Sequence, residues 1–130
     1  MRTECVGTER DDLARWSAPL IADCLGVAYR ACLGGDDRLI GYFAAHHRRV
    51  WLSAVSGDWS DATEAQRTLG ALAEMCRLSD EALDTIDHLV LDELSEVVAR
   101  RYQGSPAKTR AYNRILIDAA AVLTRARLAA

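Results

Sequence analysis

The stretch SDEALDTIDHLVLDELSEVVARRYQGSPAKTRAYNRILIDAAAVLTRARL, residues 79–128, decides the fold class of this chain. Apolar side chains recur in its first half at steps of three and four, which is the period of an amphipathic α-helix. These side chains are Leu83, Ile86, Val90, Leu94 and Val97, with Leu91 and Val98 widening the stripe. Ser79 is a typical N-cap for such a helix, and Gly104 is a typical terminator. The pattern predicts a long helix over roughly 80–102.

A second long helix is predicted from Ser105–Pro106 to the end of the chain, because a capping serine followed by proline is a common helix start. Its apolar face is broad. One stripe has heptad spacing (Tyr112, Ile115, Ala119, Val122 and Ala126), and a second lies beside it (Leu116, Ala120 and Leu123). A helix with so broad an apolar face can contact more than one neighbour. We expect one face in the domain core and the other in a homodimer; the alternative is that the whole helix lies in one core.

The homodimer interface is expected along both long helices. Its candidate residues are Val90, Leu94, Ile115, Ala119, Val122 and Ala126. The small alanine side chains of the last helix would let the two chains approach closely.

Start and stop signals also divide residues 1–78 into helices. Pro19, two residues after Ser17, marks a helix start, and Gly34–Gly35 marks a helix end. The expected helices are a short acidic one after Thr8, one from Ser17 to Leu33, one from Asp36 or Asp37 to Ser56, and one from Ser60 or Asp61 to about Arg77. Because no repeat or linker divides the chain, we expect a single all-helical domain over residues 1–130.

Length and composition bound the class of function. With 130 residues, 50% of them hydrophobic, the chain is long enough to bury a core without disulfides. The formal net charge of −3 and the pI near 5.6 argue against a nucleic-acid partner. The sequence has neither an apolar run of roughly 18 residues nor a signal-peptide pattern, so we expect a cytoplasmic protein with no membrane insertion.

Residues that could carry chemistry form no recognisable constellation. Cys5, Cys24, Cys32 and Cys76 lack metal-site spacing, and we expect reduced thiols. A solvated basic patch is expected from His46, His47, Arg48 and Arg49. A solvated acidic face is expected on the 80–102 helix, from Asp80, Glu81, Asp84, Asp87, Asp92, Glu93 and Glu96. Because no nucleophile or phosphate-binding motif occurs, we expect no catalytic centre and no metal site.

Four short motifs follow one another along the second half of the chain. They are Trp51-Leu52-Ser53-Ala54-Val55-Ser56-Gly57-Asp58-Trp59, Arg67-Thr68-Leu69-Gly70, Leu78 before the helix from Ser79, and Ile115-Leu116-Ile117-Asp118. In this order, over roughly residues 45–125, the chain resembles the globin-coupled sensor family, the protoglobin-like branch of the globins. The resemblance implies a globin-like helical bundle that dimerises through its last two long helices. It also implies a sensory or regulatory domain of a bacterial-type signalling protein.

One departure from the family pattern concerns the cofactor. The family places its haem-ligating His three residues after the glycine of the second motif, and here that position is Ala73. Alanine has no donor atom for iron. The resemblance therefore implies a haem-free member, with no cofactor, whose final helix passes a signal to a C-terminal output domain or a signalling protein.

An apolar pocket is expected where the family's segments wrap the cofactor. Its candidate residues are Tyr29, Trp51, Leu69, Leu72 and Ala73. Two alternatives stay open for this space. Either it holds a small apolar ligand such as a fatty acid, or tryptophan and leucine side chains fill it and the domain only binds proteins. A stand-alone helical protein-interaction adaptor is a further alternative to the sensory domain.

Overall fold

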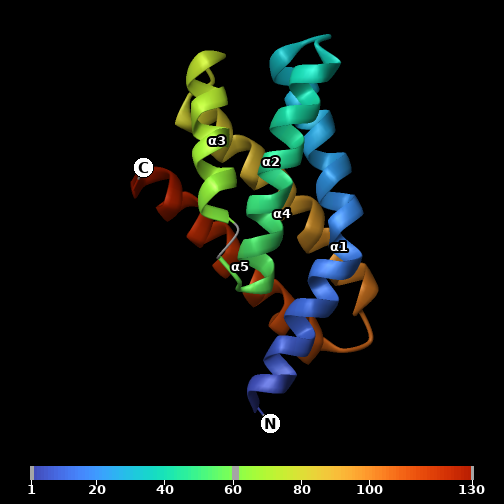
Figure 1. Cartoon of the computed structure of the whole chain (residues 1–130). Coiled ribbons are helices and arrows are strands. Elements are labelled where there is room, and N and C mark those ends of the chain that lie inside the picture. The colour runs from blue at the N-terminus through green and yellow to red at the C-terminus, as the bar shows by residue number, and fades with distance from the viewer. Residues whose placement is uncertain (1, 60–61, 130) are drawn as a thin grey trace.

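The computed structural model describes residues 2–59 and 62–129, and all regular structure in these ranges is helical. The helices are α1 (Arg2–Leu33), α2 (Asp37–Ser56), α3 (Ala62–Met75), α4 (Asp80–Arg101) and α5 (Pro106–Ala129) (Figure 1). The predicted all-helical fold class is confirmed. None of these five helices is long and apolar enough to cross a membrane.

Side-chain caps begin α2 and α4 where the sequence predicts them. Asp36 accepts a hydrogen bond from the Leu39 amide at 3.1 Å, and Ser79 accepts one from the Ala82 amide at 3.1 Å. Each bond satisfies an amide that the first helical turn leaves without a backbone partner. These short-range signals therefore set the starts of two of the helices.

The end of α2 requires a glycine. Gly57 adopts a φ of 83°, and its amide donates to the Ser53 carbonyl at 3.0 Å. A residue with a Cβ atom would be strained in this left-handed conformation. The next helix is α3, whose expected caps, Ser60 and Asp61, lie outside the described residues.

The prediction of two separate helices before Gly34 is wrong, because α1 runs without a break from Arg2 to Leu33 with Pro19 in its interior. Proline inside a helix removes one backbone hydrogen bond and normally favours a break. Packing outweighs that preference here. Leu13 before the proline and Ile21 after it are both fully buried on the same helix.

A polar contact also holds the first half of α1 against the α4–α5 turn. Oδ2 of Asp12 accepts hydrogen bonds from the hydroxyls of Tyr102 (3.1 Å) and Tyr112 (2.8 Å). The bond from Tyr112 is the main cause that lowers the pKa of Asp12, so the carboxylate is charged at neutral pH. Trp16, one turn along α1, donates from Nε1 to the Tyr102 hydroxyl at 3.2 Å. These bonds keep the residues before Pro19 in line with those after it.

The helices form two layers (Figure 1). α1, α2 and α3 lie side by side in chain order, and α4 and α5 pack as a pair behind them, with α4 against α1 and α5 against α2. The core lies between the layers and takes side chains from every helix, among them Leu25, Phe43, Val50, Leu69, Val90 and Leu116.

We expect Pro19→Ala to raise the free energy of unfolding by about 1–2 kcal/mol, because alanine restores a backbone hydrogen bond and relieves the crowding of the preceding turn. Pro106→Ala is the matched control. Pro106 is the first residue of α5, where no helical bond can be restored, so the change should stay within about 0.5 kcal/mol. Urea unfolding followed by circular dichroism measures both. Equal effects would contradict a continuous α1.

Candidate functional site

Polar and aromatic side chains from four helices meet inside the bundle: Tyr29 of α1, His47 and Trp51 of α2, Asp87 of α4 and Arg127 of α5. These residues form the buried polar cluster. Tyr29, His47 and Trp51 are fully buried, and Arg127, the most exposed member, is 9% exposed. Polar groups so far from water need partners within the protein.

α2 places His47 in the interior because of its spacing. His47 lies four residues after Phe43 and four before Trp51, and all three are on the buried face of α2. The prediction that His47 belongs to a solvated basic patch is therefore wrong, although its neighbours Arg48 and Arg49 are exposed. The signal that could have located His47 is this four-residue repeat with two aromatic residues.

His47 links α1 to α4 through its two ring nitrogens. Nδ1 lies 2.6 Å from Oη of Tyr29, and Nε2 lies 2.6 Å from Oδ1 of Asp87. Because a carboxylate only accepts, we assign the ring proton to Nε2, which donates to Asp87, while the Tyr29 hydroxyl donates to Nδ1. Burial is the main cause that raises the pKa of Tyr29, and the negative charge of Asp87 adds to it, so the phenol keeps its proton.

The cluster converges on the carboxylate of Asp87. Oδ1 accepts from Nε1 of Trp51 at 2.9 Å as well as from His47, and Oδ2 accepts from Arg127 at 2.6 Å. Arg127 also lies 2.6 Å from Oδ1 of Asp84, at the edge of the cluster. The Asp87 and Arg127 side chains are 5% and 6% exposed, so they form a buried ion pair. Each charge would be strongly unfavourable in the interior without the other.

The predicted solvated acidic face of α4 is correct only in part. Asp92, Glu93 and Glu96 are exposed. The prediction is wrong for Asp87, which lies three residues before Val90 on the buried face. Its position within the apolar stripe was visible in the sequence, but its charged side chain argued for the surface.

The residues predicted to line one apolar pocket are divided between two places. Tyr29 and Trp51 belong to the buried polar cluster. Leu69 and Ala73 are buried side chains that line an open pocket of about 590 Å³ between α3 and the start of α4. Leu72 is partly buried and packs against the core.

The candidates for a homodimer interface lie inside a single chain or at the edge of its core. Val90, Leu94, Ile115 and Ala119 are buried, and Val122 and Ala126 are partly buried. This is the arrangement expected if one core encloses these faces. The exposed side of α5 carries a different set: Arg110, Arg114, Ile117, Ala121 and Leu128.

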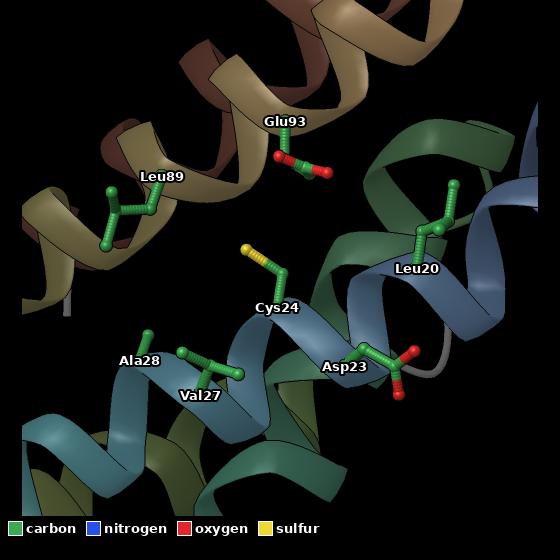
Figure 2. A pocket seen from close by; sticks show the side chains of 7 residues that line it. All are labelled: Leu20, Asp23, Cys24, Val27, Ala28, Leu89 and Glu93. Atoms are coloured by element: carbon green, nitrogen blue, oxygen red, sulfur yellow. The ribbon is translucent and has the colours of Figure 1, made fainter.

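A surface groove lies between α1 and α4 (Figure 2). This α1/α4 groove is lined by Leu20, Asp23, Cys24, Val27 and Ala28 of α1 and by Leu89 and Glu93 of α4, around a volume of about 420 Å³. The sulfur of Cys24 points across the gap towards α4, and Glu93 points from α4 towards α1 (Figure 2). Burial is the main cause that raises the pKa of Cys24, and the charge of Glu93 adds to it. The protonated thiol is part of an apolar surface and is a poor nucleophile.

These sites offer packing and binding surfaces more than reactive groups. His47 and Asp87 lie at the distance of an acid–base pair, but both His47 nitrogens are occupied and the ring is fully buried. Among the residues that the structure describes, no group of three or more His, Cys, Asp or Glu side chains could hold a metal ion. Comparisons with protein families, curated proteins and solved structures found no match for the chain.

Asp87→Ala should lower the free energy of unfolding by about 3–5 kcal/mol, since it removes the buried one of the two carboxylates that Arg127 binds and leaves the buried donors of His47 and Trp51 without an acceptor. If that variant does not fold, Asp87→Asn is the milder substitution. The double variant Asp87→Ala/Arg127→Met should lose less free energy of unfolding than the two single variants lose in sum, with a coupling energy of about 2–3 kcal/mol. Urea unfolding of the wild type, the two single variants and the double variant measures this coupling.

Arg125→Met is the matched control for Arg127→Met, because Arg125 is an exposed arginine on the same helix. It should change the free energy of unfolding by no more than about 0.5 kcal/mol. Additive effects of the Asp87 and Arg127 substitutions would show that the ion pair is not what holds α5 against α4.

Proposed function

We propose that the chain is a haem-free helical regulatory domain that acts by binding other proteins. In this proposal, a change in helix packing passes along α5 to an output domain or a signalling partner. The resemblance of four sequence motifs to the globin-coupled sensors supports this class of function, with Ala73 at the position of the family's haem ligand.

The observation that carries the proposal is the filled interior around Tyr29 and Trp51. Tyr29 stacks on Phe43 with ring centroids 4.8 Å apart, and the ring of His47 meets it edge-on. A planar cofactor or a fatty acid at this place would have to displace side chains that are hydrogen-bonded to one another. Of the two alternatives for this space, the filled interior favours the protein-binding domain.

The buried polar cluster supports a role for α5 in passing a signal on. Arg127, in the last turn of α5, is bound to Asp84 and Asp87 of α4. Asp87 in turn binds His47 of α2, which binds Tyr29 of α1. A packing change that separates one of these pairs would shift the C-terminal end of α5. An element with two discrete packings is the physical requirement for such a switch.

The proposal includes a homodimer through the exposed sides of α4 and α5. α5 presents Ile117 and Leu128, which are 57% and 74% exposed, together with Arg114. α4 presents Asp92 and Glu96. A symmetric pair of chains would bring the basic side of α5 onto the acidic side of the partner's α4 and cover the apolar side chains.

A second candidate function is the binding of a small apolar molecule in the open pocket between α3 and α4. Leu69, Ala73, Leu78 and Leu83 contribute apolar side chains to its lining, which also includes Arg127. Arg127 is already paired with two carboxylates, so the apolar lining would have to provide most of the binding free energy.

The purified protein is expected to be colourless and to show no Soret band after incubation with haemin, because Ala73 offers no ligand and the interior is occupied. Absorption spectroscopy measures this, and a sharp stoichiometric band would contradict the proposal.

Native mass spectrometry of the same preparation tests the second candidate function, the binding of a small apolar molecule. A co-purified fatty acid would support ligand sensing as the function. Protein without a bound lipid would support the proposal of a protein-binding domain.

Sedimentation is expected to give a homodimer at micromolar concentrations, and Ile117→Glu should give monomers. The new carboxylate removes an apolar contact and has to be desolvated at the interface. Met75→Glu is the matched control, because Met75 is a 79% exposed apolar side chain on α3 and is not part of the proposed interface. A monomeric wild type, or a dimer that survives Ile117→Glu, would contradict the proposed interface.

A further inference from the structure

The α1/α4 groove is an apolar surface on the opposite side of α4 from α5. Val27 and Leu89, on its two walls, are 73% and 49% exposed. Exposed apolar side chains that gather around a hollow mark binding sites more often than scattered ones do. On α4, Leu89 and Glu93 line the groove that α4 forms with α1. His88 and Leu91 line a separate surface pocket that α4 forms with α5. α4 therefore separates this groove from the proposed dimer surface.

The shape of the groove indicates the kind of segment that fits it. Its walls are two helices in contact, and a ridge of side chains from a third helix can lie between two such walls. The backbone groups of helical walls are bonded internally, so an extended segment would find no sheet edge to join. Cys24 and Ala28 are small side chains on the groove's lining, which leaves room for large apolar side chains from a partner.

The charges at the groove indicate the character of the partner. Asp23 of α1 and Glu93 of α4 are the charged lining residues, and both are acidic and exposed. Figure 2 shows one on each of the two helices that form the walls. A helix with lysine or arginine on both sides of its apolar ridge would pair with the two carboxylates, and an acidic helix would be repelled.

We propose that the α1/α4 groove binds a basic amphipathic helix of a partner protein. Its large apolar side chains lie between Val27 and Leu89, and its basic residues lie beside Asp23 and Glu93. This inference rests on the proposed function only in that the domain acts by binding proteins. It is independent of the homodimer.

Fluorescence anisotropy with two labelled peptides tests the inference. Each peptide has roughly 18 residues, about five helical turns, with leucine at every third or fourth position. Lysines flank the leucine ridge in the first peptide, and glutamates take their place in the second. The lysine peptide should bind at least about tenfold more tightly at low salt, and added salt should reduce the difference. No binding of the lysine peptide, or equal binding of both, would overturn the inference.

Charge reversal in the groove gives a sharper result. The double variant Asp23→Lys/Glu93→Lys should prefer the glutamate peptide, because the substitutions exchange the sign of both groove charges. Both residues are exposed, so the variant should fold, which circular dichroism checks. An unchanged preference for the lysine peptide would overturn the inference.

A matched pair of apolar substitutions locates the peptide. Leu89→Ser should weaken binding of the lysine peptide about tenfold or more, whereas Ile117→Ser, on the exposed side of α5, should leave it unchanged. Equal loss in the two variants would overturn the assignment to the groove, and a loss confined to Ile117→Ser would place the peptide on the α4/α5 surface. Sedimentation of the same proteins separates the two proposals. Peptide binding by a monomeric wild type would support the groove and reject the homodimer.

Discussion

The architecture depends on keeping the carboxylate of Asp87 inside the bundle. Removing a carboxylate from water is unfavourable by several kcal/mol unless charged and polar donors replace the water. Trp51 and His47 of α2 and Arg127 of α5 supply those donors at 2.6–2.9 Å. Apolar contacts tolerate small rotations of a helix, but directional hydrogen bonds at these distances do not. The cluster therefore sets the rotation of α2 and α5 about their own axes, and Tyr29 extends this control to α1 through His47.

A second carboxylate plays a comparable part at the other end of the α4–α5 pair. Asp12 of α1 accepts hydrogen bonds from the hydroxyls of Tyr102 and Tyr112. The Asp12 side chain is partly exposed at the surface. Along α5, Tyr112 and Arg127 are separated by 15 residues, or roughly 22 Å of helix. Asp12 thus binds α1 directly to the residues around the α4–α5 turn, and Asp87 binds α1 through His47 and Tyr29 at a distant point. This spacing explains how α1 keeps one direction across Pro19.

Much of the fold could be predicted from local signals, and the exceptions have identifiable causes. Asp36, Ser79 and Pro106 begin helices for reasons contained in a few neighbouring residues. Pro19 was misleading because the contacts that keep α1 continuous, through Asp12 and Leu13, come from residues distant in the sequence.

The candidate site was harder to predict than the fold. His47 and Asp87 occupy helix positions on apolar faces, but their polarity argued for solvent, and only the mutual pairing of distant residues makes their burial favourable. Periodicity also shows which side of α5 is apolar without showing whether the neighbour belongs to the same chain, so Ile115 and Ala119 were assigned to a dimer although they face their own core. The resemblance to globin-coupled sensors stays a prediction.

The place of Arg127 in the last turn of α5 has a consequence for proteolysis. Arg125, two residues earlier, is exposed and offers a trypsin-type protease a cleavage site. Cleavage there would separate Arg127 from the rest of α5 and leave Asp84 and Asp87 without their cation. Helix ends ordinarily tolerate trimming because they contribute little to the interior. In this chain a cut near the end of α5 would act at the centre of the bundle, so a single cleavage would expose further cleavage sites in the domain.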